Sequence, residues 1–336
     1  MRHLFTLLFI ISPFSGLCQN SDLPADFLSK DFHKDRRQKL RESLPANSVA
    51  VVFANPVRNR ANDVNYVYHQ DPNFYYLTGY KEPDAILFVF KDKQIASNST
   101  RYDEILFIQP RNALREMWTG RRLGEAGAKE ILGFEQAFNN SEFRRYNVDF
   151  SKFDKIIFED FKNDVRDSDQ DSSDLYDLIA QFKAKVKYPE KNNLALSREV
   201  VKNNLDTQSL DILMGNLRGI KTKEEIELIR KAVSISCAGQ VEVLKAMKPG
   251  MSEREIQGIH EFVFKKYQAE DLGYPSIVGA GHNGCILHYI DNYKPEITSK
   301  ELILMDLGAE FHGYSADITR TFPVNGKFSS RAKINL

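Results

Sequence analysis

Residues 301–324 read ELILMDLGAEFHGYSADITRTFPV. Two apolar segments flank a polar turn, a pattern that predicts a β-hairpin. With the hairpin centred between Phe311 and His312, Asp306 lies directly opposite Asp317 on the neighbouring strand, and a bulge would shift this register by one residue. Directly opposed side chains point to the same face of a sheet, with Cβ atoms about 4.5–5.5 Å apart. The sequence therefore predicts two carboxylates side by side within apolar strands.

Two facing carboxylates repel each other and are costly to keep in apolar strands. Protonation of one carboxyl would relieve the repulsion, and a bound divalent cation would relieve it more completely. Carboxylate oxygens suit manganese, magnesium or calcium, and zinc in a mixed ligand set. The alternative is a pair of solvent-facing carboxylates on an open sheet. The spacing of Asp306 and Asp317 leaves both interpretations open.

A glycine-rich segment precedes the hairpin. Residues 274–289 read YPSIVGAGHNGCILHY, which predicts two short strands around a tight loop. His288 falls in the second predicted strand, where a lone histidine is more often an ordinary core residue than a catalytic one. If His288 lies beside the two aspartates, its neutral imidazole can hydrogen-bond a substrate carbonyl or a developing oxyanion.

The hydrophobic pattern changes near residues 211–221, which predicts a domain boundary there. The first part mixes predicted strands with helices and indicates an α/β domain. Its predicted strands are 48–54, 73–80, 85–90, 104–108 and 155–158, and its predicted helices are 23–44 and 120–132. In the second part, Thr-x-x-Glu at 222–225 and Ser-x-x-Glu at 252–255 are capping boxes that each begin an amphipathic helix. Predicted strands at 276–278, 285–289, 302–309 and 314–322 then indicate an α+β domain.

The charge balance excludes two classes of partner. The chain has 46 basic and 46 acidic residues, so it lacks the basic surface that nucleic acids or anionic membranes require. Hydrophobic residues make up 42% of the chain, which is enough for globular domains. Cys237 and Cys285 have no metal-ligand spacing and lie in apolar stretches, so we expect both to be small buried side chains.

The first 18 residues, MRHLFTLLFIISPFSGLC, have the order of a secretory signal peptide: a basic tip, an apolar run and a small-residue region. The apolar run is shorter than the roughly 20 residues of a spanning helix, and Pro13 interrupts it. A lipoprotein signal at Cys18 is disfavoured, because Leu17 stands where a small residue is required. We therefore expect an exported protein, periplasmic or secreted, without membrane association after signal removal.

Together these segments resemble the aminopeptidase P family of pita-bread metallopeptidases. The resemblance rests on NFYYLTGYKEPDAILFVF (73–90), PRNALREMWTGRRLG (110–124), SIVGAGHNGCILHY (276–289) and MDLGAEFHGYSADITRTFPVNGKF (305–328). It implies an α/β N-terminal domain over 24–205, ribonuclease H-like with a mixed sheet. An α+β pita-bread catalytic domain would follow over 211–336.

The resemblance also implies a reaction and its residues. The family hydrolyses the bond between an N-terminal residue and a following proline, with two divalent ions, usually manganese, that share a hydroxide. Asp306 and Asp317 match metal ligands, the second of them bridging the two ions. His288 matches the catalytic, substrate-contacting histidine, and Tyr274 an aromatic at the pocket wall. Trp118 matches a residue that approaches a neighbouring active site in family oligomers, or else it is an ordinary packing aromatic. Peptides with proline in second position and a homo-oligomer of the complete protein follow as expected partners.

One departure from the family pattern affects the expected activity. The family supplies a histidine and two glutamates as further ligands after the bridging aspartate, whereas residues 318–336 contain no His, Asp or Glu. We therefore expect an incomplete pita-bread domain that is inactive alone and exposes apolar surface. The alternatives are a prolidase-type Xaa-Pro dipeptidase and a non-catalytic pita-bread binding module.

Overall fold

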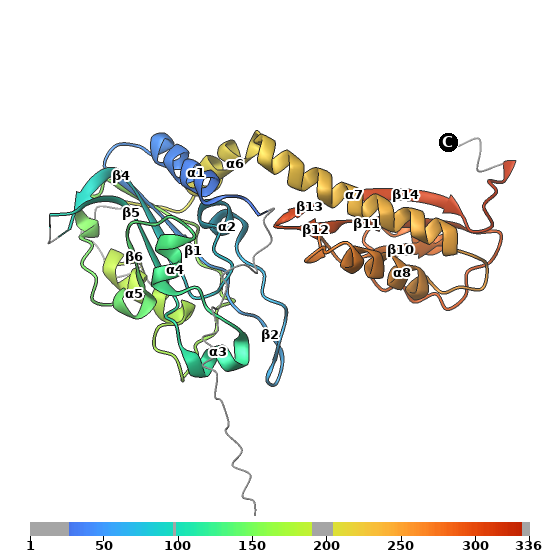
Figure 1. Ribbon diagram of the computed structural model, residues 1–336, viewed down its shortest axis with the longest axis horizontal. Helices are drawn as coiled ribbons and strands as arrows, with labels where there is room; N and C mark the ends of the chain where they lie inside the picture. The colour runs from blue at the N-terminus through green and yellow to red at the C-terminus, as the bar shows by residue number, and fades with distance from the viewer. Residues whose placement is uncertain (1–26, 97–98, 190–203, 331–336) are drawn as a thin grey trace, which may run out of the picture.

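The computed structural model describes residues 27–96, 99–189 and 204–330, and Figure 1 shows two lobes joined through the long helix α7. The signal peptide predicted at 1–18, including Cys18, lies outside the described residues. No helix in the described part of the chain is both long and apolar enough to cross a bilayer.

A mixed six-stranded sheet forms the centre of the first lobe, as the sequence predicts. Its order is β6-β5-β4-β1-β7-β8; β1, β4 and β5 pair antiparallel, while β6, β7 and β8 join in parallel. The strands are β1 Ser48–Phe53, β4 Ile86–Ile95, β5 Arg101–Ile108, β6 Ala137–Asn139, β7 Lys155–Ile157 and β8 Leu205–Asp206, and β2 Asn59–Ala61 pairs with β3 Val64–Asn65 apart from the sheet. The helices are α1 Lys30–Ser43, α2 Pro72–Thr78, α3 Ala113–Thr119, α4 Gly124–Glu130, α5 Leu175–Val186 and α6 Ser209–Gly219.

Alternate residues of the central strands fill two cores. Ala50 and Val52 of β1 pack in one core with residues of α1, α2 and α6, whereas Val49 and Val51 pack in the other with α5. The sheet therefore lies between helical layers. Leu210 and Met214 of α6 belong to the first-domain core. The division between 24–205 and 211–336 stays a prediction.

Helix α2 corrects a predicted strand at 73–80. The aromatic run there suggests a strand, but Asp71 caps the helix by accepting the backbone N–H of Phe74, and Pro72 occupies its first turn. Gly79 then ends the helix in the left-handed conformation, with φ of +72°. These local signals outweigh the strand propensity of the aromatic residues.

The second lobe contains two helices and two small sheets. Both predicted capping boxes are confirmed, at the starts of α7 Lys223–Ala246 and α8 Glu253–Lys266. The sheets have the orders β10-β11-β14 and β13-β12-β9. The strands are β9 Asp271–Leu272, β10 Ile277–Ala280, β11 Leu302–Leu307, β12 Ala309–Phe311, β13 Tyr314–Ser315 and β14 Ile318–Pro323.

Two further predictions for this lobe are wrong. Residues 285–289 are no strand: the 3-10 helix η3, Gly281–Cys285, leads into a turn there. Cys237 and Cys285 are exposed rather than buried. Cys237 lies on the outward side of α7, where Val233 and Val241 are also exposed. The apolar pattern of α7 thus extends beyond the face that packs on the sheet.

His260 of α8 makes the stability of the second lobe dependent on pH. Its side chain is fully buried beside Gly239 and Phe264, and neither ring nitrogen has a hydrogen-bond partner among the described residues. Burial lowers the pKa of His260 from 6.5 to about 4. The folded-state pKa is depressed, so the unfolded chain binds the proton first and stability falls as pH drops from 6.5 toward 4.

We predict that His260→Leu flattens this pH dependence. Between pH 7 and pH 5 the buried imidazole costs about 2 kcal/mol of unfolding free energy, which the variant no longer loses. Urea unfolding at both pH values measures the difference, with His282→Leu, at an exposed histidine, as the matched control. An unchanged difference between the two pH values in His260→Leu would contradict the prediction.

Candidate active site

The hairpin between β12 and β13 turns through two residues. Phe311 pairs with Tyr314, and the intervening His312 and Gly313 both have positive φ, +51° and +82°. This is the geometry of a tight two-residue hairpin turn, which matches the twist of the flanking strands. The predicted centre between Phe311 and His312 is therefore wrong, and the turn is centred one residue later.

The corrected register changes how the two aspartates meet. Asp306 on β11 pairs with Thr319 on β14, so the predicted direct pairing with Asp317 is wrong. Asp317 lies just before β14, two residues ahead of Thr319. Asp306 and Asp317 are therefore near each other across the hairpin without being directly paired.

A close backbone crossing separates the two aspartates. A Cβ atom at position 308 would lie 1.8 Å from the carbonyl oxygen of Ala316 and 2.9 Å from the Tyr274 ring. Only glycine fits there, because Cβ atoms do not approach a backbone oxygen this closely. The carbonyl of Gly308 accepts the backbone N–H of Gly273, which fixes the segment leading to Tyr274.

The Tyr274 hydroxyl brings the two carboxylates together. It donates to Oδ1 of Asp306 at 2.5 Å and lies 3.4 Å from Oδ1 of Asp317. Burial, the hydrogen bond to Asp306 and the nearby negative charges all raise the pKa of Tyr274, so the hydroxyl keeps its proton. The sequence predicted a wall position for this residue, and no spacing signal indicated that its hydroxyl would lie between the aspartates.

The donor set at this position fits a divalent cation. The half-buried carboxylate of Asp306 on β11 and the exposed carboxylate of Asp317 just before β14 both lie at the Tyr274 hydroxyl, and hard cations prefer such oxygen ligands. The pair offers part of a ligand set rather than a closed cage. Over the described ranges, the one group of three or more potential ligands is Asp167, Asp174 and Asp177 in the first lobe. Asp174 there caps α5 by accepting the backbone N–H of Asp177.

The other two predicted site residues are solvent-exposed. His288 lies in the turn after η3, and within the described part of the chain its side chain makes no hydrogen bond or ion pair. Trp118 lies on the short helix α3 of the first lobe and is 89% exposed, beside the exposed Leu114 and Met117. The structure joins Tyr274 to the two aspartates and records no such contact for His288 or Trp118.

Comparisons with known proteins place both lobes in named families. Residues 33–156 match the aminopeptidase P N-terminal domain, and residues 227–335 match metallopeptidase family M24. The chain is 33% identical over 302 residues to the Xaa-Pro aminopeptidase of Escherichia coli (strain K12), covering 90% of this chain and 64% of that relative. It is 32% identical over 287 residues to Xaa-Pro aminopeptidase 3 of Homo sapiens, covering 84% of this chain and 52% of that relative.

Solved structures give the same result. Aminopeptidase P from E. coli with the inhibitor Pro-Leu has a TM-score of 0.73 at 31% identity, covering 90% of this chain and 64% of that one. Zn-substituted E. coli aminopeptidase P in complex with product has a TM-score of 0.73 at 30% identity, covering 91% and 65%. The chain thus spans less than two thirds of the length of the relatives that it matches.

We predict that Gly308→Ala disrupts the aspartate pair. The new Cβ would overlap the Ala316 carbonyl, so the two strands must separate, which costs about 2–3 kcal/mol of unfolding free energy. Thermal unfolding provides the measurement. Gly258→Ala in α8 is the matched control, because a Cβ at position 258 meets no atom within 4 Å. Equal melting temperatures for Gly308→Ala and the parent chain would refute the overlap.

Proposed function

We propose that this protein, which belongs to the aminopeptidase P family of M24 metallopeptidases, functions as a metal-dependent Xaa-Pro aminopeptidase. The reaction is hydrolysis of the bond between an N-terminal residue and a following proline. The substrates are peptides with proline in second position. The observation that carries the proposal is the convergence of Asp306 and Asp317 on the hydroxyl of Tyr274.

Asp306 and Asp317 are the proposed metal ligands. The family resemblance implies two divalent ions, usually manganese, and hard carboxylate oxygens suit such ions. When bound, such ions would lower the pKa of a coordinated water and polarise the scissile carbonyl. A cation would also neutralise the two carboxylates that otherwise share one phenolic proton.

The chain's own side chains have distinct proposed roles. Tyr274 orients the Asp306 carboxylate through its 2.5 Å hydrogen bond and forms part of the substrate-pocket wall. His288 is free to donate to the carbonyl of a bound peptide, since its side chain is exposed. Trp118 is proposed to reach toward the active site of a neighbouring subunit, an interpretation that its exposure supports.

We also propose a fold type for each lobe and a cellular location for the protein. The mixed sheet with helices on both faces supports a ribonuclease H-like first domain, and α7 and α8 with their small sheets support part of a pita-bread domain. The signal-like residues 1–18 support export to the periplasm or the medium. A homo-oligomer is proposed for the complete protein.

We predict that residues 1–336 bind Mn²⁺ through the aspartate pair. Asp306→Asn removes one ligand charge and should weaken binding at least 10-fold, or about 1.4 kcal/mol, by isothermal titration calorimetry. Asp167→Asn, in the first-lobe carboxylate cluster, is the matched control and should bind as the parent does. Absence of binding by the parent at micromolar Mn²⁺ would instead favour a non-catalytic binding module.

Substrate length distinguishes the two peptidase interpretations. The protein purified from its source should release the first residue of an Xaa-Pro-containing tripeptide or longer peptide faster than it cleaves an Xaa-Pro dipeptide. A preference for the dipeptide would indicate a prolidase.

A further inference from the structure

The chain between the two aspartates projects toward the first lobe. Residues 307–316 form the crossing at Gly308 and the β12–β13 hairpin, and Figure 1 shows this hairpin directed at α2 and the first domain. Asp306 and Asp317 lie at the two ends of this segment. The two arms of the hairpin therefore connect its tip directly to the two carboxylates.

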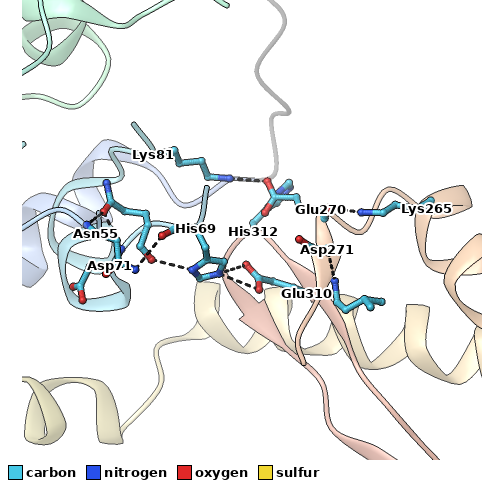
Figure 2. Close-up of polar contacts among 11 residues, drawn as sticks. Asn55, His69, Asp71, Lys81, Lys265, Glu270, Asp271, Glu310 and His312 are labelled. Atoms are coloured by element: carbon cyan, nitrogen blue, oxygen red, sulfur yellow. Dashed lines mark hydrogen bonds and ion pairs between the residues drawn. The ribbon is translucent and has the colours of Figure 1, made fainter. Parts of the chain in front are cut away.

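Ion pairs link the hairpin and its neighbouring strand to the first lobe, as Figure 2 shows. His69 Nε2 lies 2.9 and 3.1 Å from the two carboxylate oxygens of Glu310 on β12. His69 Nδ1 lies 3.0 Å from the carbonyl oxygen of Gln70. Both ring nitrogens thus face acceptors, an arrangement that the protonated imidazole satisfies best.

A second ion pair reaches the turn itself. Lys81 Nζ donates to Glu270 Oε1 at 2.6 Å, and the Nδ1 atom of His312 lies 3.2 Å from the same oxygen. Although burial opposes ionisation, the hydrogen bonds from His312 and Lys81 lower the pKa of Glu270 to about 2. The carboxylate is therefore charged at any working pH and can hold both groups.

Aromatic contacts fix the tip from the side of the first lobe. The ring of Phe27 stacks on His312 with centroids 3.7 Å apart, and Lys81 Nζ lies 4.0 Å from the Phe27 centroid. At Gly313 a Cβ atom would lie 2.8 Å from the ring of Tyr75. Leu28, next to Phe27, packs against both hydrophobic cores. The turn is thus held by the Phe27 and Tyr75 rings of the first domain and by Glu270, which Lys81 of the first domain pairs with.

These contacts lie on the opposite side of a cleft from the α6–α7 connection, which joins the two lobes covalently. A cavity of about 670 Å³ is lined by His69, Lys81, Glu270 and Glu310, and also by Arg218 in the last turn of α6 and Lys221 in the α6–α7 connection. Exposed ion pairs contribute little to global stability, and the His69 side chain is 58% exposed. These ion pairs therefore affect the position of the hairpin rather than the folding of the lobes.

We propose that Phe27, His69 and Lys81 of the first lobe are positioning residues for the aspartate pair. With Glu270, Glu310 and His312 they form an interdomain latch that holds the β12–β13 hairpin and thereby sets the spacing of Asp306 and Asp317. The metal-binding consequence of this inference rests on the proposed function. The structural consequence, that the first domain holds the hairpin in place, is independent of the proposed function.

A charge swap in the full chain tests the latch. Lys81→Glu and Glu270→Lys, made singly, should speed amide hydrogen exchange in metal-free peptides covering residues 302–323 at least 5-fold. The double variant restores opposite charges between positions 81 and 270, although not the contacts with His312 and Phe27, and should slow exchange at least 2-fold relative to either single variant. The matched control is the same swap at Lys245 and Glu242, an exposed pair on α7, which should leave this segment unchanged. His69→Ala, at an exposed position, gives a second variant that should also speed exchange.

The outcomes separate the latch from the proposed function. Unchanged exchange in the single variants, or no recovery in the double variant, overturns the latch. If exchange responds, single reversals should also weaken Mn²⁺ binding at least 3-fold in calorimetry, and the swap should restore it. Equal Mn²⁺ affinity in parent and loosened variants overturns the positioning role. A parent that binds no Mn²⁺ overturns the proposed function, and the exchange data still decide on the latch.

Discussion

The close crossing of Gly308 and Ala316 is the constraint on which the candidate site depends. At this point the chain leaves the sheet β10-β11-β14 and enters the sheet β13-β12-β9. The carbonyl of Ala316 takes the space that any side chain at position 308 would fill. Because Asp306 and Asp317 flank the crossing, both carboxylates come within reach of the Tyr274 hydroxyl.

Local hydrogen-bond signals made much of the fold predictable. The capping boxes at Thr222 and Ser252 fix the starts of α7 and α8 through contacts within four residues, so tertiary structure does not alter them. The apolar strands β1, β4 and β5 were equally predictable from their sequence. Helix α2 was missed because its aromatic residues suggest a strand, while Asp71 and Gly79 carry the deciding information at its ends.

The sequence indicated that the two aspartates lie close together but not how they meet. Their metal-binding role stays a prediction, and Asp317 proves to be exposed just before β14. The register itself depends on His312 adopting positive φ, which a non-glycine residue seldom does. The place of Tyr274 between the carboxylates arises from contacts between segments far apart in sequence. Cys237 was predicted to be buried because its neighbours in α7 are apolar, but the apolar residues of α7 extend beyond the face that packs on the sheet.

The two-residue turn also limits how this part of the chain can change in length. Side chains of a strand alternate between faces, so one inserted residue on either arm would rotate one aspartate to the opposite side of the hairpin. Insertions of one residue in each arm would keep both carboxylates on a common face but would push the tip further into the first lobe. Length changes that preserve the aspartate pair are therefore expected to be paired and to need compensating changes around Tyr75 and Phe27.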